Sequence, residues 1–244
     1  MRPILRGPSP IAIDYSNYTE AKPDLVARLG PFCSFCERPV TTQLAVEHIQ
    51  PKGLACYAHL IGRWSNFLLA CVNCNSTKKD KDLQPQNAYL PDRDNTFFAY
   101  IYLPNGVIEA SPVLSPPQAA TAKETLKLLG LDKPVVNTLD ENGTLVALDR
   151  VSQRMEAWLA ATEAKNDVDV SPGNAELKKY VVKLAIKTGF FSVWMTVFNG
   201  DANMRLALIN AFKGTNTSGC FDPTTSDPIS PSPNADALLD GGKL

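Results

Sequence analysis

Two cysteine pairs of the form Cys-x-x-Cys are the part of the sequence best suited to bind a metal ion. They are Cys33-Ser-Phe-Cys36 and Cys71-Val-Asn-Cys74, and 34 residues separate them. Each such turn points two thiolates toward one tetrahedral ion, so the two turns together predict a four-cysteine zinc site. Because four thiolates leave no coordination position open, we expect this zinc to be structural. Four buried free thiols are the alternative, and a redox dithiol is disfavoured because neither pair opens a helix in a βαβ pattern.

A second group of residues lies between and just after these pairs and suits hydrolysis of a phosphodiester bond. Glu47 and His48 are expected to end a short strand that Pro51 stops, and Asn75 directly follows the second cysteine pair. A neutral imidazole can take a proton from an attacking water molecule. A hard divalent cation prefers oxygen ligands, which the Glu47 carboxylate and the Asn75 amide can supply.

Residues 33 to 82 resemble an HNH endonuclease of the ββα-metal class. The resemblance rests on the two cysteine pairs together with Glu47-His48, Asn66 and Asn75 at nine residues' distance from Asn66. It implies that His48 is the catalytic base and that Asn66 completes the catalytic motif by tying a loop to the catalytic strand. It also implies that Glu47 and Asn75 bind Mg²⁺ or Mn²⁺. Many members of the family carry Asp where this chain has Glu47.

Four lysines near this motif are expected to contact the phosphate backbone of nucleic acid. They are Lys52, Lys78, Lys79 and Lys81. DNA is the expected polymer because HNH enzymes usually cut DNA, and RNA is the alternative.

A narrower resemblance concerns the HNH nucleases of bacterial Septu and retron anti-phage systems. It is carried by Cys-x-x-Cys-Glu, Glu-His-x-x-Pro-Lys and Trp-x-Asn, and by residues 126–131 and 148–150 of the second half. The resemblance implies a helical second half and an SMC-like or ABC-type ATPase partner. A stand-alone McrA-like restriction nuclease, an inactive zinc-ribbon binding module and a structural adaptor are the alternatives.

The elements that must position these residues form an α+β protein with four parts. Residues 1–30 are expected to be an N-terminal arm with a short helix, and residues 31–92 a zinc-stabilised ββα-metal HNH module. Residues 93–213 are expected to form a β-hairpin and a helical domain that binds a partner. Residues 214–244 are rich in Pro and Ser, with four Asp against one Lys, and we expect this acidic tail to be largely disordered.

The helical half carries several start and stop signals. Apolar residues predict a helix over 118–129, and another over 149–165 with Val151, Met155, Trp158 and Leu159 on its buried face. A third helix is expected between Pro172 and Gly189, and a buried aromatic one over 190–198. Asp201 is expected to cap a last helix.

Composition sets the limits of these interpretations. The chain has 244 residues, a net charge of −1 and 20% charged residues. This balance argues against a protein that coats nucleic acid by bulk charge, so binding must use a local patch or a partner. The sequence has no apolar run of about 18 residues and no long apolar segment at its start. A cytoplasmic location, no membrane span and reduced cysteines are therefore expected.

Overall fold

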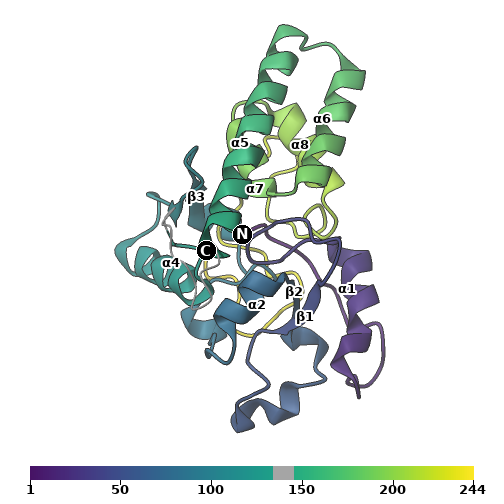
Figure 1. Ribbon diagram of the computed structural model, residues 1–244, viewed down its shortest axis with the longest axis vertical. Coiled ribbons are helices and arrows are strands. Elements are labelled where there is room, and N and C mark those ends of the chain that lie inside the picture. Colours follow the sequence, from purple (N-terminus) through teal and green to yellow (C-terminus); the bar gives the residue numbers. More distant parts are fainter. Residues whose placement is uncertain (134–145) are drawn as a thin grey trace.

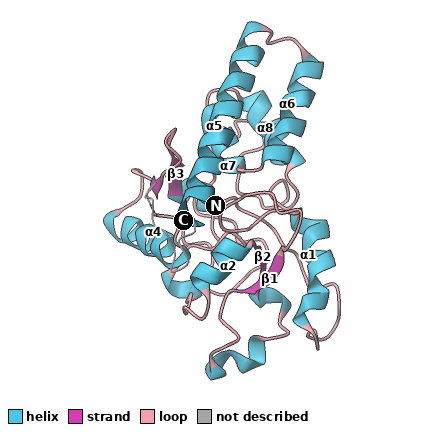
Figure 2. Cartoon of the chain, viewed as in Figure 1, coloured by secondary structure: helices cyan, strands magenta, loops and turns pink. Residues whose placement is uncertain are grey.

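The computed structural model describes residues 1–133 and 146–244, with only the backbone of 146–149. It shows helices around two small sheets of two antiparallel strands each (Figures 1 and 2), as expected for an α+β chain. Among the helices of the described residues, none has the length and apolar character needed to cross a membrane.

The first sheet contains Glu47 and His48 at the end of one strand and leads through its other strand to the second cysteine pair. Strand β1 (Ala45–His48) pairs with β2 (Phe67–Ala70), so that His48 faces Phe67 in the register. Helix α2 (Val72–Lys78) follows β2 after a single residue, Cys71. All four residues of β2 are buried, which explains why this strand reads as an uninterrupted apolar run. The connection between the strands carries the 3₁₀ turns η2 (Ala55–Leu60) and η3 (Trp64–Asn66).

The expected hairpin is confirmed, and each of its strands has three residues. Strands β3 (Tyr100–Tyr102) and β4 (Ile108–Ala110) are antiparallel and turn at Gly106, which has a φ of +75°. The one-turn helix α3 (Thr96–Ala99) precedes them, and η4 (Pro85–Asn87) lies further upstream. Helix α4 (Pro116–Leu129) follows and begins two residues before the expected start.

Four helices build residues 146–244, the described part of the second half. They are α5 (Val146–Val170), α6 (Ala175–Thr188), α7 (Phe191–Val197) and α8 (Ala202–Ala211). Asp201 caps α8 by accepting a hydrogen bond from the Met204 amide at 3.0 Å, as the sequence predicts. Helices α5 and α6 form a hairpin that projects away from β1, β2 and α2 (Figure 1).

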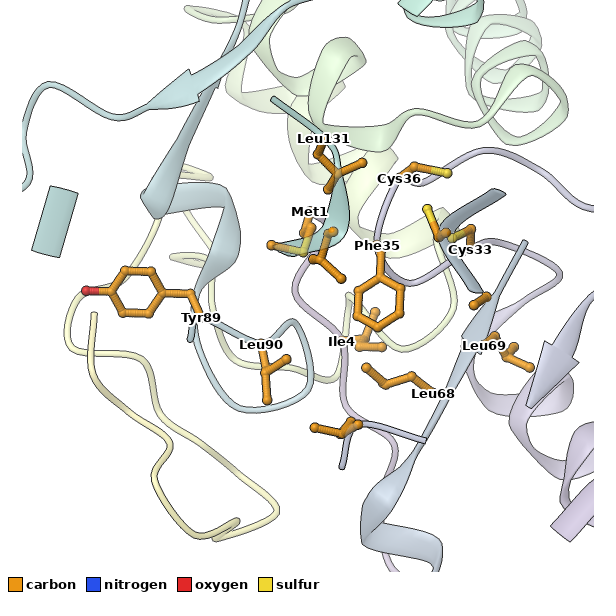
Figure 3. Packing of buried hydrophobic residues seen from close by; sticks show 14 of the residues in the cluster. Met1, Ile4, Cys33, Phe35, Cys36, Leu68, Leu69, Tyr89, Leu90 and Leu131 are labelled. Carbon is orange, nitrogen blue, oxygen red and sulfur yellow. The ribbon is translucent and has the colours of Figure 1, made fainter. Parts of the chain in front are cut away.

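The expected N-terminal arm is wrong as a description of residues 1–30. The 3₁₀ turn η1 (Tyr18–Ala21) and helix α1 (Lys22–Leu29) confirm the short helix, but the segment before them is part of the core. Met1 and Ile4 pack with Phe35, Leu68 and Leu90 (Figure 3). One hydrophobic core therefore runs across the expected boundaries at residues 30 and 92.

The expectation of a disordered C-terminal tail is also wrong. Asn95 is fully buried, and its side-chain amide donates to the carbonyl oxygens of Cys220 and Ile229 at 2.7 and 3.0 Å. Lys243 forms an ion pair with Asp94 at 3.4 Å, and Leu244 is buried. Buried polar groups of residues 92–95 need partners, and the backbone of the tail supplies them.

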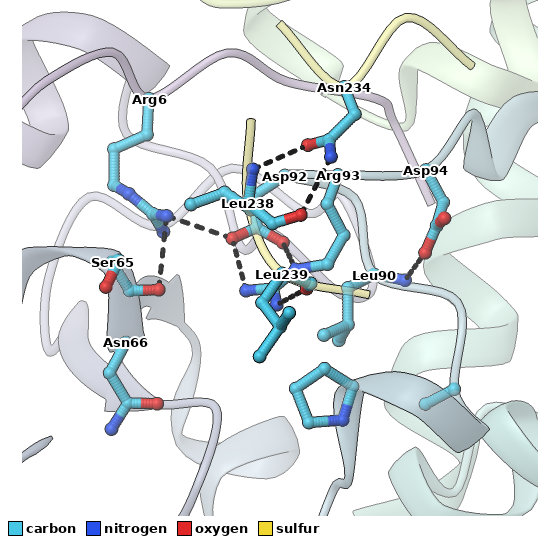
Figure 4. A network of polar contacts seen from close by, with 12 residues as sticks. Arg6, Ser65, Asn66, Leu90, Asp92, Arg93, Asp94, Asn234, Leu238 and Leu239 are labelled. Carbon is cyan, nitrogen blue, oxygen red and sulfur yellow. Dashed lines mark hydrogen bonds and ion pairs between the residues drawn. The ribbon is translucent and has the colours of Figure 1, made fainter. Parts of the chain in front are cut away.

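A buried ion-pair network joins the two terminal segments to the module (Figure 4). Asp92 lies between Arg6 and Arg93, with both ion pairs at 3.1 Å. Arg6 also donates to the carbonyl oxygen of Ser65 at 3.2 Å, and Arg93 donates to that of Leu239 at 2.9 Å. The network therefore anchors the η3 turn through the carbonyl oxygen of Ser65.

Helix α5 buries only part of the face that its apolar residues predict. Val151 is buried and Trp158 is half-buried against the core, but Met155 and Leu159 are 42% and 61% exposed. Arg150 and Arg154 are buried instead, at 4% and 2% exposure. Their partners lie on other elements, so periodicity within the helix could not reveal this face.

Candidate nuclease site

The four paired cysteines form one buried cluster. The sulfur atoms of Cys33, Cys36, Cys71 and Cys74 all lie within 4.8 Å of one another. The sulfurs of Cys36 and Cys71 are 3.7 Å apart, and a tetrahedral ion with zinc–sulfur bonds of about 2.3 Å requires an edge of about 3.8 Å. The donor set and its spacing therefore fit zinc. Cys56 is exposed and Cys220 is buried elsewhere, so neither belongs to the cluster.

Helix α2 also contributes to a surface cleft of about 400 Å³, which Asn75 lines directly after the cluster residue Cys74. Glu47, His48 and Asn75 all line the cleft, together with Lys52 and Lys79. Consecutive strand residues normally point to opposite faces. Glu47 and His48 share one cleft because they end β1, where the chain turns toward Pro51.

The imidazole of His48 is held in one orientation. Its Nε2 donates to the carbonyl oxygen of Ile61 at 2.9 Å. Because a carbonyl oxygen can only accept, we assign the proton of the neutral ring to Nε2, which leaves Nδ1 as the acceptor. The rings of Tyr18 and Phe67 meet the imidazole nearly edge-on, at centroid distances of 4.7 and 5.3 Å. Burial lowers the pKa of His48, and the positive charges of Lys52 and Lys78 act in the same direction. The hydrogen bond to Ile61 opposes this shift without reversing it, so the neutral base is favoured.

Asn66 fastens the loop that orients His48. Its side-chain oxygen accepts from the Gln50 amide at 2.8 Å, and its side-chain nitrogen donates to the Gln50 and Leu60 carbonyl oxygens at 3.0 and 3.3 Å. Leu60 directly precedes Ile61, whose carbonyl holds the imidazole. Asn66 is buried and does not line the cleft, so it acts on His48 through the backbone.

Glu47 is paired inside the protein with Lys78. The Lys78 ammonium lies 3.0 Å from Glu47 Oε1 and donates to the His48 carbonyl oxygen at 2.7 Å. Burial raises the pKa of Glu47, and Lys78 opposes that shift. Lys78 is only 1% exposed, so the expectation that it contacts phosphate is wrong in this structure. A lysine at the end of a helix reads as a surface residue, and only the fold shows that it points inward.

The other predicted residues lie in two places. Asn75 is half-buried beside the cleft, and Lys52 and Lys79 are exposed at its rim. Lys52 contacts Tyr18, with its ammonium 2.5 Å from the hydroxyl. Lys81 instead donates to the Leu128 carbonyl oxygen at the end of α4 at 3.3 Å, outside the cleft.

Sequence reasoning missed the lining residues Tyr18, Lys22 and Asp80, which bring a phenol and two charges to the cleft. Tyr18 and Lys22 come from the N-terminal segment and form the far side of the cleft, while Asp80 follows α2. Tyr18 and Lys22 are distant in sequence from the motif and carry no spacing signal. Asp80 could have been noticed as a second carboxylate close to Asn75.

The match to a known family falls on this same region. The family model of HNH endonucleases matches residues 33–81. That segment is about a fifth of the chain and contains the cysteine cluster, β1, β2 and α2. No curated protein matches the chain. The HNH domain supports a nuclease hydrolase in general, and it implies nucleic-acid binding.

Proposed function

We propose that the protein is a metal-dependent HNH endonuclease of the ββα-metal type that hydrolyses phosphodiester bonds with His48 as the general base. The observation that carries the proposal is the hydrogen bond from His48 Nε2 to Ile61, in the cleft that Glu47 and Asn75 also line. It leaves Nδ1 unprotonated in the neutral ring, as an acceptor for the proton of an attacking water.

The carboxylate of Glu47 and the amide oxygen of Asn75 would hold a divalent cation, Mg²⁺ or Mn²⁺. Such a cation, when bound, stabilises negative charge on the phosphate and on the leaving oxygen. Lys78 holds the Glu47 carboxylate by its ion pair and the β1 backbone by its hydrogen bond to His48. Asn66 donates to the carbonyl oxygen of Leu60 and thereby restrains the backbone at Ile61, the next residue. The cysteine cluster, with zinc, fixes α2 against the β strands.

The rim of the cleft favours a polyanionic substrate. Lys22, Lys52 and Lys79 are exposed there, against the carboxylate of Asp80. Glu47 adds little negative charge because Lys78 balances it. Three lysines can neutralise a short stretch of phosphates, which suits a nucleic-acid strand passing over His48. DNA is the proposed polymer.

A partner protein would supply the additional nucleic-acid affinity that three lysines cannot provide. The chain has a net charge of −1, so unaided binding to long duplexes is expected to be weak. We extend the proposal to an ATPase partner bound by the helical half, in a bacterial anti-phage system of the Septu or retron kind. Co-purification with an ATPase encoded beside the gene tests this extension, and the absence of a complex would refute it.

Cleavage of supercoiled plasmid and of total RNA tests the nuclease proposal itself. The wild type and His48→Ala are compared with Mg²⁺, with Mn²⁺ and with EDTA, with and without the ATPase. Metal-dependent cutting that disappears in His48→Ala supports the proposal and identifies the polymer. Equal cutting by both proteins, or none by folded protein with its partner present, would refute it.

A further inference from the structure

Helix α5 buries two arginines one turn apart, against the pattern of its apolar residues. Arg150 and Arg154 are 4% and 2% exposed. A buried guanidinium is costly unless a counter-charge and hydrogen-bond acceptors surround it. Among the described residues, no carboxylate lies within ion-pair distance of either arginine. Within the described part of the chain, the groups around Arg150 and Arg154 other than ion-paired carboxylates therefore decide how their charge is balanced.

The cysteine cluster is the group that the Arg150 side chain meets. Arg150 Nη1 lies 3.5 Å from the sulfur of Cys74. The same guanidinium donates to the carbonyl oxygens of Leu129 and Gly130, at 3.3 and 3.0 Å, where α4 ends. Arg150 thus links α5, the end of α4 and the second cysteine pair.

Arg154 lies one turn further along α5. Its Nε donates to the Gly106 carbonyl oxygen at 2.6 Å, while its Nη1 is buried without a hydrogen-bond partner among the described residues. Burial lowers the pKa of Arg154 and the charge of Arg150 acts in the same direction, whereas Tyr102, Cys36 and Glu37 act in the opposite direction. A guanidinium so placed gains from a nearby anionic group.

A zinc ion bound by four thiolates carries a formal charge of about −2, which two arginines match. The other buried charge beside the cluster, Glu37, has its own cation, because the Met1 amino group lies 3.2 Å from its carboxylate. Glu37 also acts on Arg154 electrostatically, but it forms its ion pair with Met1.

We propose that Arg150 and Arg154 balance the charge of the zinc–thiolate cluster, so that the zinc ion fixes the helical half to the HNH module as well as joining the two cysteine pairs. A second hydrogen bond also connects the first cysteine pair to the helical half: Glu37, next to Cys36, accepts from the Ser192 amide of α7 at 2.7 Å. The cluster is thus tied to both α5 and α7. This inference goes beyond the nuclease proposal and depends only on zinc binding.

Zinc affinity of the full chain tests the proposal without any substrate. Competition with a chromogenic chelator compares the wild type with Arg150→Met, Arg154→Met and Arg150→Lys. Arg63→Met is the matched control, because Arg63 is half-exposed and pairs with Asp14. Loss of a group that supports metal ligands typically weakens affinity by about 10–100-fold. We expect such a loss in both Met variants, partial recovery in Arg150→Lys and no change in the control.

Hydrogen exchange tests the link between zinc and the helical half. Removal of zinc from the wild type is expected to raise exchange in residues 150–170 and 191–197. If Arg150→Met folds less well, zinc affinity is compared between the wild type and Arg150→Lys, which keeps the positive charge but loses the planar guanidinium. Zinc affinity of both Met variants equal to that of Arg63→Met, or exchange in 150–170 unaffected by zinc removal, would overturn the proposal. A wild type that binds no zinc would overturn it as well, whatever its nuclease activity.

Discussion

The cysteine cluster and the cleft both draw residues from one short helix, α2, and they differ in donor type, burial and access. The cluster offers four soft sulfur donors, all buried, with no position left for a substrate. The cleft offers oxygen donors and an oriented imidazole in a space of about 400 Å³. Both depend on α2, which carries Cys74 toward the cluster and Asn75 toward the cleft.

In the proposed function, this difference separates structure from reactivity within one fold. A closed site can only hold the chain together, whereas an open one can admit water and a phosphate. Each side also places a buried cation against its anionic group: Arg150 against Cys74, and Lys78 against Glu47. This division of roles would fail if damage to one site always abolished the function of the other.

Replacing a cluster ligand is expected to have the largest effect. In Cys74→Ser, zinc retention should fall sharply and the module should unfold, since structural zinc supplies about 10–16 kcal/mol of apparent binding energy in zinc-finger peptides. Zinc content and thermal unfolding measure this, with Cys56→Ser as the control because Cys56 is exposed. A folded Cys74→Ser protein would mean that the cluster is not a zinc site.

His48→Ala is expected to reduce cleavage by about 10²–10⁴-fold, the usual contribution of a general base. Zinc content should stay at the wild-type level, because His48 does not touch the cluster. The initial rate of plasmid cleavage is the measurement, and His59→Ala is the control because His59 is exposed. Loss of zinc in His48→Ala would contradict the separation of the two sites.

Asp92→Asn should destabilise the fold by about 3–5 kcal/mol, because it leaves Arg6 and Arg93 buried without their anion. Burial alone would raise the pKa of Asp92, but Arg93 and Arg6 outweigh it and the pKa lies below its usual value. The wild type should therefore have the full contribution of Asp92 above about pH 4 and lose it as the pH falls through the lower folded pKa.

Urea unfolding as a function of pH measures this contribution. The difference in the free energy of unfolding between the wild type and Asp92→Asn should shrink on acidification below about pH 4. A difference that stays constant down to about pH 2 would argue against an ionised Asp92 in the folded protein. Asp132→Asn, at an exposed position, provides the control.

Asn66→Ala sharpens the comparison on the cleft side. It removes three hydrogen bonds to Gln50 and Leu60, so the Ile61 carbonyl should lose its fixed position. We expect a loss of about 1–3 kcal/mol in stability and a fall in cleavage rate, with zinc content unchanged. Asn216→Ala, at an exposed position, should match the wild type in all three measurements.

Lys79→Ala should have the smallest effect. Removal of one lysine–phosphate pair is expected to reduce the slope of log affinity against log salt by about 0.7–0.9. Fluorescence polarisation with labelled DNA, in a His48→Ala background, measures the slope. Lys123→Ala, exposed on α4, is the control; an unchanged slope in Lys79→Ala would remove Lys79 from the substrate surface.

Local sequence signals predicted much of the module because its chemistry depends on residues close in the chain. The cysteine spacing predicted a cluster that the structure confirms, and Pro51 and Asp201 marked real element ends. The inward side chains of Lys78 and Arg150 were not predictable, because their partners come from other elements. The disorder predicted for residues 214–244 from composition was wrong for the same reason. Carbonyl groups of the tail accept hydrogen bonds from buried Asn95, and the tail's own sequence does not show that Asn95 needs them.

Selective metal exchange on one protein preparation tests the central claim most directly. Zinc-loaded protein is treated briefly with EDTA, its zinc is counted, and plasmid cleavage is measured before and after Mg²⁺ or Mn²⁺ is restored, with the partner ATPase present if it is required. We expect cleavage to disappear and to return with the added cation, while the zinc ion of each chain is retained throughout. Cleavage that follows the zinc content, or that survives without the added cation, would contradict the assignment of structure to the cluster and chemistry to the cleft.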